Sequence, residues 1–258
     1  MKKIRLTIED DIFFQNASQE NYILNLTNDI INSSPEYSIK EKNNIYNKVK
    51  YGVSRCEYYG ILRDDLVYKY IGIMFSSAGT FFDENPIYLH KTKVLTDNKI
   101  NKEEEIEKIY EYFSELSKKI TNNESKYIYF SLNYLISEIF IDNNIDVDKY
   151  IKLNLIDKYL LVDYSKLNEL KEKTKKDIKK YGISEKYIYD QFYLISFILG
   201  YRWYLDPRYP NIEEYLTSKN LLNEKINLIE KFINNKAIEK KKFIENVHPK
   251  YLYRGDNV

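Results

Sequence analysis

The sequence predicts an all-α protein made of two diverged copies of one helical unit, packed into one helical array. The first observation is that the 258 residues include only 7 Gly and 5 Pro, whereas all-β chains need more turn residues. The second is that apolar residues recur at helical spacing between clear start and stop signals. Hydrophobic residues make up 43% of the chain, which is enough for a folded core.

The first two predicted helices are defined by their ends. One covers about residues 7–32, with Thr7 as its N-cap and Ser33-Ser34-Pro35 after its last turn. The next begins at a capping box, Ser38-Ile39-Lys40-Glu41, and carries an apolar face. Gly60 is placed to end it in a left-handed conformation.

A third helix is predicted over about residues 63–78, with Gly79 directly after it. An aromatic and acidic loop, residues 80–86, follows, and its Pro86 is suited to start a short helix. Asn101 caps a further helix, whose apolar face is formed by Ile106, Ile109 and Phe113. Residues 125–142 are also predicted to be helical, and they are strongly apolar.

Residues 145–162 leave two interpretations open. They read as helix for most of their length, but the segment Tyr159-Leu160-Leu161-Val162 also fits a short strand. From Ser165 onward the order of features seen earlier recurs, beginning with a Lys-rich helix.

The recurrence is visible as matched glycines, aromatic residues and Asx-Pro pairs at offsets of about 120 residues. The matched pairs are Tyr59-Gly60-Ile61 with Tyr181-Gly182-Ile183, Gly79 with Gly200, Phe82 with Trp203, and Asn85-Pro86 with Asp206-Pro207. We therefore predict a duplication, with one unit over residues 1–122 and the other over residues 123–258. The alternative is two ordinary helical hairpins that share good caps.

Charge and cysteine content limit the class of protein. The 40 basic and 39 acidic residues give a net charge of +1, which provides no field for steering onto DNA or an anionic membrane. The single Cys56 excludes an internal disulfide, and no apolar run approaches the length of a membrane span. We expect a cytoplasmic protein. The lysines between Lys171 and Lys180 are best explained as a solvated helix face, with nucleic-acid binding as the weaker alternative.

No recognisable set of catalytic residues occurs in the sequence. His90 and His248 are the 2 histidines, and neither has a Cys or His neighbour at metal-ligand spacing. Cys56 lies on an apolar helix face, and Gly-rich phosphate loops are absent from the sequence. We therefore predict no catalytic residue, no metal site and no cofactor. The enzyme alternative requires a carboxylate site in which Asp64, Asp65, Asp83 and Glu84 converge.

Two matched aromatic loops supply the predicted partner-binding residues. Tyr and Arg side chains around Trp203 have the composition of an interface hot spot, and the first loop adds an acidic counterpart. Trp203 itself, like Phe82, is expected to fill the interior of its unit. The predicted binding residues are Tyr201, Arg202, Tyr204, Arg208, Tyr209, Phe81, Asp83 and Glu84.

Residues 4–116 resemble an uncharacterised bacterial family of small helical proteins encoded beside type VI secretion effectors and their spike or adaptor genes. The resemblance is carried by Ile4-Arg5-Leu6-Thr7, Tyr59-Gly60-Ile61, Met74-Phe75, Gly79, Phe82-Asp83 and Pro86. The second copy keeps Gly200 and Pro207 but lacks the Phe-Asp pair. The resemblance implies a non-catalytic helper that binds a toxin or a component of the secretion apparatus, either as an effector chaperone or adaptor or as an immunity protein.

Overall fold

The computed structural model describes residues 8–33, 41–97, 99–121 and 146–247, and over these ranges the chain is helical with no strand. The predicted all-α class is confirmed. We call residues 8–121 the first half, residues 146–247 the second half, and the contact between them the seam. The predicted helix at residues 125–142, the boundary between residues 122 and 123, and the residues Ser38 to Lys40 of the predicted capping box lie outside the described residues.

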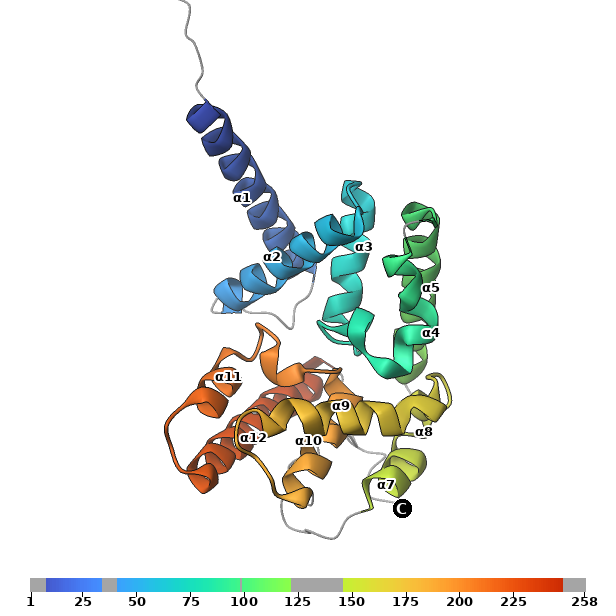
Figure 1. Cartoon of the computed structure of the whole chain (residues 1–258), viewed down its shortest axis with the longest axis vertical. Helices are drawn as coiled ribbons and strands as arrows, with labels where there is room; N and C mark the ends of the chain where they lie inside the picture. The colour runs from blue at the N-terminus through green and yellow to red at the C-terminus, as the bar shows by residue number, and fades with distance from the viewer. Residues whose placement is uncertain (1–7, 34–40, 98, 122–145, 248–258) are drawn as a thin grey trace, which may run out of the picture.

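The first half contains a long helical pair and a more compact group of helices (Figure 1). Helix α2 packs against both α1 and α3, α3 also packs against α5, and α1 projects away from the rest of the chain (Figure 1). The 3₁₀ turns and the short α4 connect α3 to α5. Its elements are α1 (Ile8–Ser33), α2 (Lys42–Tyr59), α3 (Asp64–Phe75), η2 (Phe82–Glu84), η3 (Pro86–Tyr88), α4 (Leu89–Thr92), η4 (Lys93–Thr96) and α5 (Lys102–Thr121).

The second half is organised around the pair formed by α9 and α10. Helix α7 packs on α10, α8 contacts α5 of the first half, and α11 packs on α12 (Figure 1). Its elements are α7 (Val147–Asn154), α8 (Ile156–Tyr159), η5 (Tyr164–Lys166), α9 (Leu167–Lys179), α10 (Lys186–Leu199), η6 (Trp203–Leu205), α11 (Pro210–Thr217) and α12 (Leu222–Val247).

The helix-ending glycines behave as the sequence predicts. Gly60 adopts a left-handed conformation with φ of 72°, and its N–H donates to the carbonyls of the last turn of α2. Gly79, Gly182 and Gly200 also have positive φ, at 82°, 81° and 106°. Because a positive φ is strained for residues with a Cβ, these positions end helices at low cost only as glycine.

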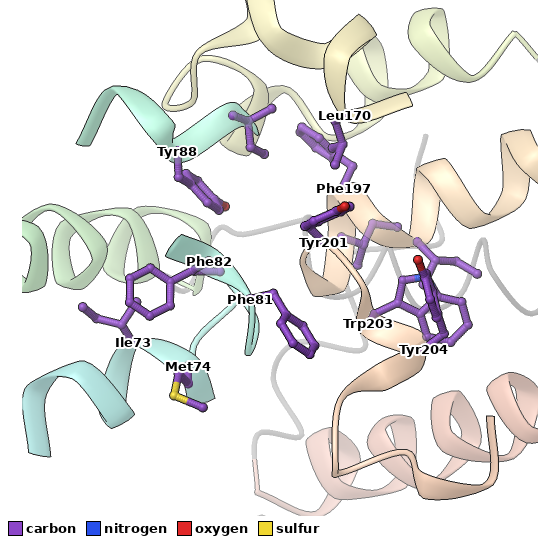
Figure 2. Close-up of a cluster of buried hydrophobic side chains, with 14 of the residues drawn as sticks. Ile73, Met74, Phe81, Phe82, Tyr88, Leu170, Phe197, Tyr201, Trp203 and Tyr204 are labelled. Carbon is purple, nitrogen blue, oxygen red and sulfur yellow. The ribbon is translucent and has the colours of Figure 1, made fainter. Parts of the chain in front are cut away.

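One hydrophobic core extends through both halves (Figure 2). Phe82 is completely buried against Tyr70 and Phe113, with ring centroids 4.9 and 5.2 Å apart. Trp203 is 2% exposed and packs on Phe192 at 5.3 Å. The interior role expected for both aromatic residues is confirmed.

Two local predictions need correction. Tyr159 ends α8, and residues 160–162 form a turn and a bend, so the strand alternative is wrong. Pro86 does start η3, but the matching Pro207 starts no helix: the Asx residue before each proline accepts from the N–H two positions on, yet in the second half the chain continues as a turn and α11 begins only at Pro210. Among the described residues, no helix combines the length and apolar character needed to cross a bilayer.

Candidate functional site

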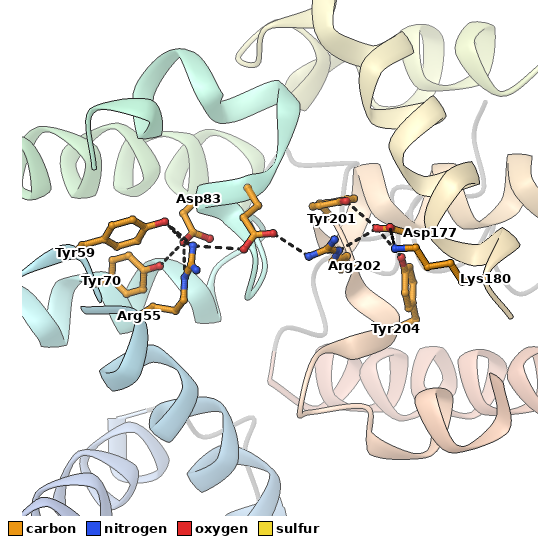
Figure 3. A network of polar contacts seen from close by, with 10 residues as sticks. Arg55, Tyr59, Tyr70, Asp83, Asp177, Lys180, Tyr201, Arg202 and Tyr204 are labelled. Atoms are coloured by element: carbon orange, nitrogen blue, oxygen red, sulfur yellow. Dashed lines mark hydrogen bonds and ion pairs between the residues drawn. The ribbon is translucent and has the colours of Figure 1, made fainter. Parts of the chain in front are cut away.

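The seam holds the densest group of polar contacts, and its first part surrounds the buried carboxylate of Asp83 (Figure 3). The Nε of Arg55 donates to Oδ2 of Asp83 at 2.9 Å. The hydroxyls of Tyr59 and Tyr70 donate to the same oxygen at 2.8 and 2.9 Å. Burial and the Asp83 charge raise the pKa values of both tyrosines, so both remain neutral hydrogen-bond donors.

A second carboxylate, Asp177 on α9, has a matching environment in the other half (Figure 3). Its Oδ2 accepts from the hydroxyl of Tyr201 at 2.8 Å and from Nε of Arg202 at 2.9 Å, and its Oδ1 accepts from Lys180 at 2.8 Å. Burial alone would raise the pKa of Asp177, but hydrogen bonds from Lys180, Arg202 and Tyr201 lower it to about 2. Asp177 is therefore ionised at neutral pH.

Glu84 joins the two clusters across the seam. Its Oε2 accepts from Nη1 of Arg202 at 2.9 Å, and its Oε1 lies 3.4 Å from Nη2 of Arg55. Arg202 is held in a left-handed conformation with φ of 53°. A non-glycine residue pays for this conformation, so the ion pairs of Arg202 help to fix a strained turn.

A fully buried ion pair links the halves at a second point. Nζ of Lys48 on α2 lies 2.8 Å from Oδ2 of Asp206, and the two side chains are 0% and 2% exposed. Thr80 donates to the same oxygen at 2.6 Å, and Nη2 of Arg208 lies 2.9 Å from it. Burial would raise the pKa of Asp206, but the charges of Arg208 and Lys48 hold it well below its usual range.

A third point of contact is Lys158 of α8, whose side chain is completely buried. Its Nζ donates to the carbonyls of Ser77, Phe197 and Ile198 at 2.9, 2.6 and 3.2 Å. Phe197 and Ile198 belong to the last turn of α10, where the helix dipole favours a cation, and Ser77 lies in the turn that follows α3. Burial nevertheless lowers the pKa of Lys158 to about 7.

The predicted partner-binding residues are gathered by the fold, but mainly in the interior. Phe81, Asp83, Tyr201 and Tyr204 are buried. Glu84, Arg202, Arg208 and Tyr209 keep part of their surface exposed, and the first three form the ion pairs described above. The burial of the first four is at odds with a direct contact to a partner, because their side chains already fill the seam.

The carboxylates of the enzyme alternative take separate structural contacts. Asp65 pairs with Arg63 at the exposed start of α3, whereas Asp83 and Glu84 belong to the seam. Cys56 is 1% exposed, and burial raises the pKa of its thiol, in agreement with a structural role. Within the described ranges, no group of three or more His, Cys, Asp or Glu side chains is arranged to hold a metal ion.

Three of the six lysines between Lys171 and Lys180 form ion pairs within the chain. Nζ of Lys171 lies 3.4 Å from Asp148 and 3.5 Å from Asp190. Lys173 pairs with Glu169, and Lys180 pairs with Asp177. These pairs neutralise much of the local charge, which weakens the nucleic-acid alternative.

One surface feature was not predicted from the sequence. Four large apolar side chains close together in the chain, on and beside α7, α8 and η5, face solvent. They are Leu153, Ile156, Leu160 and Tyr164, at 63%, 39%, 67% and 59% exposure. Tyr164 also stacks on Tyr159, with ring centroids 5.4 Å apart. The sequence signal that could have indicated this surface is the ambiguous pattern of residues 145–162, which contain more apolar residues than one buried helix face can hold. We call these four residues the α7–α8 apolar surface.

The fold and the seam define a class: an all-α protein in which ion pairs and buried hydrogen bonds join two helical halves. No family model, no curated protein and no solved structure matches this chain. Its function is therefore argued from its own residues.

Proposed function

We propose that this chain is a non-catalytic, protein-binding accessory factor of a bacterial secreted-toxin system, acting as an effector chaperone or adaptor or as an immunity protein. The observation that carries the proposal is the α7–α8 apolar surface. Several large apolar side chains exposed within a short stretch of chain are typical of protein–protein contact sites. Leu153 and Leu160, the two most exposed of the four at 63% and 67%, would be the central contacts.

The contacts of the ionisable groups support a non-catalytic role. Asp83, Asp177 and Asp206 each accept several hydrogen bonds from Arg, Lys, Tyr or Thr side chains, and each is buried. A general acid or base needs a pKa near the working pH and access to a substrate. Hydrogen bonds and ion pairs hold the pKa values of Asp177 and Asp206 far below neutral pH, and burial restricts their access to a substrate.

The test is co-expression of the full chain with the product of the neighbouring gene in its source genome. We expect the two proteins to be purified together in a 1:1 ratio. A Leu153→Ser/Leu160→Ser variant should lose binding at least tenfold, about 1.4 kcal/mol or more, with little change in its urea unfolding midpoint. Leu221→Ser is the matched control, because Leu221 is 74% exposed just before α12.

The two roles within the proposal give different results in cells. A chaperone or adaptor is needed for soluble yield or delivery of its partner, whereas an immunity protein restores growth of cells that produce the toxin. Failure to recover a partner, or full binding by the Leu153→Ser/Leu160→Ser variant, would contradict the proposal.

A further inference from the structure

We propose that the seam is a self-complementary interface: the two halves meet through the same surface, related by an approximate twofold axis, so that each half is shaped to bind a second copy of the same helical unit. This inference concerns the seam alone and does not depend on the proposed function.

The same helix pair occurs in both halves at the same register. The buried positions of α2 that recur in α9, at an offset of 122 residues, are Ile45 with Leu167, Lys48 with Leu170, Gly52 with Thr174 and Cys56 with Ile178. In the first half, a Cβ at Gly52 would lie 2.8 Å from Sδ of Met74. In the second half, the matching Thr174 and Ser196 are 3.4 Å apart through their hydroxyls. Helices α2 and α3 therefore meet at the same point as α9 and α10.

The differences between the pairs have a simple cause. Val49 and Val53 of α2 are buried, whereas their counterparts Lys171 and Lys175 are partly or fully exposed. Helix α1 packs on α2. Among the described elements no helix other than its partner α10 packs on α9 as α1 packs on α2, which explains the apolar residues at those two positions of α2.

The axis is located by the two matched glycines that follow α3 and α10. A Cβ on Gly79 would lie 2.5 Å from the carbonyl oxygen of Leu199 and 2.9 Å from Cα of Gly200. A Cβ on Gly200 would meet the carbonyl oxygen of Ala78 and Cα of Gly79, both closer than 3.0 Å. Each glycine thus lies against the other glycine and against the residue that precedes that other glycine in the sequence. Reciprocal contact between equivalent residues is what a twofold axis produces.

Lys158 marks the same axis. Its Nζ donates to the carbonyl of Ser77 at 2.9 Å and to that of Ile198 at 3.2 Å. Ser77 and Ile198 each lie two residues before a glycine of the central contact, so a single lysine binds equivalent carbonyls of both halves. A group that bonds equivalent atoms on both sides must lie close to the axis.

The contacts between loops and helices are also exchanged. In one direction, Asp206 of the second half binds Lys48 of α2. In the other direction, η3 of the first half packs against α9 (Figure 2). The residue equivalent to Asp206 is Asn85, directly before η3, and the residue equivalent to Lys48 is Leu170 of α9. Both are completely buried. The ion pair is therefore present on one side of the axis, and an amide and an apolar side chain occupy the equivalent places on the other.

The first test compares glycine variants of the full chain by urea unfolding. Gly79→Ala and Gly200→Ala should each raise the unfolding constant at least about tenfold and by similar amounts, because each Cβ meets backbone of the other half. The double variant should lose less than the two single losses combined, since one displacement relieves both clashes. Gly60→Ala and Gly182→Ala are matched controls: φ is 72° and 81° there, and a Cβ meets nothing within 4 Å. The stability losses of Gly60→Ala and Gly182→Ala should be additive in the double variant.

The second test builds the missing ion pair. Under the twofold relation, Asn85→Asp and Leu170→Lys place a carboxylate and an amine as Asp206 and Lys48 are placed now. Each single variant buries a new charge and should be destabilised, whereas the double variant should be more stable than the sum of the two single losses predicts. A double variant at or below that sum, or one that does not fold, overturns the proposal. So do unequal losses at Gly79 and Gly200.

Discussion

The buried contact between Asp206 and Lys48 predicts an unequal response to two conservative substitutions. Asp206→Asn should destabilise the protein more than Lys48→Met. After Lys48→Met, the carboxylate still has Arg208 at 2.9 Å and Thr80 at 2.6 Å. After Asp206→Asn, Arg208 keeps its charge without the carboxylate, and Lys48, which is 0% exposed and whose pKa is already lowered to about 7 by burial and the Arg208 charge, is left neutral and desolvated without its ion-pair partner.

The magnitudes follow from these partners. Removing one member of a buried ion pair and leaving its charge uncompensated costs about 3–5 kcal/mol, which we expect for Asp206→Asn. A hydrogen bond to a charged group contributes about 1.5–3 kcal/mol. Lys48→Met also removes the cost of burying the Lys48 amine, which offsets part of the lost hydrogen-bond energy. We therefore expect a loss of about 1–2 kcal/mol in the free energy of unfolding for Lys48→Met. At about 3 °C per kcal/mol for a chain of this size, Asp206→Asn should lower Tm by about 10 °C.

The assay is urea unfolding at pH 7, followed by far-ultraviolet circular dichroism. The double variant should cost less than the two single variants together, because Lys48→Met removes the amine that Asp206→Asn leaves buried without its carboxylate. Asp65→Asn is the control: the Arg63–Asp65 pair is 53% and 51% exposed, so the expected change is below about 1 kcal/mol. Equal or greater loss from Lys48→Met, or simple additivity, would refute the reasoning.

Three further predictions concern other described residues. The folded-state pKa of Asp177 is about 2, below its ordinary 3.8. Its contribution to the free energy of unfolding, about 2 kcal/mol, is therefore present above pH 3.8 and lost as the pH falls toward 2. Asp177→Asn should flatten this part of an acid-unfolding curve. The folded-state pKa of Lys158 is about 7, below 10.5, so the unfolded chain binds more protons and stability should rise from pH 7 to 9; Lys158→Met should reduce that rise in urea midpoints. Trp203→Ala should cost about 3–5 kcal/mol in urea unfolding, whereas Leu62→Ala, at a residue 77% exposed, should cost less than about 0.5.

The helical class and most helix ends could be predicted because they depend on local chemistry. Gly60 and Gly79 indicate a chain reversal from the local sequence alone, because a residue with a Cβ adopts a positive φ only at an energetic cost. Asn101 likewise caps α5, and its Oδ1 accepts from the N–H of Glu103 at 3.1 Å. These signals need only a few neighbouring residues.

The seam could not be predicted in the same way, because its partners are distant in the sequence. Lys48 and Asp206 are 158 positions apart, and Glu84 and Arg202 are 118 apart. Lysine is rarely buried, so its type alone argued for exposure at position 48. A weaker signal was present, since Lys48 falls between Ile45 and Val49 on the buried face of α2.

The partner-binding hypothesis for Tyr201, Arg202 and Tyr204 used a composition that two situations share. Tyr and Arg enriched around a tryptophan are typical of hot spots between proteins. A contact between two halves of one chain demands the same residues, for the same reasons of area and hydrogen bonding. Composition alone therefore indicated an interface without indicating which surfaces it joins.

The complete burial of Lys48 and Lys158 gives the chain two built-in reporters of its own opening. An amine-reactive reagent modifies exposed lysines at once, but it reaches these two only when the first and second halves separate. The rate of their modification, read by mass spectrometry against an exposed lysine such as Lys108, would measure how often the halves part while the helices themselves stay folded.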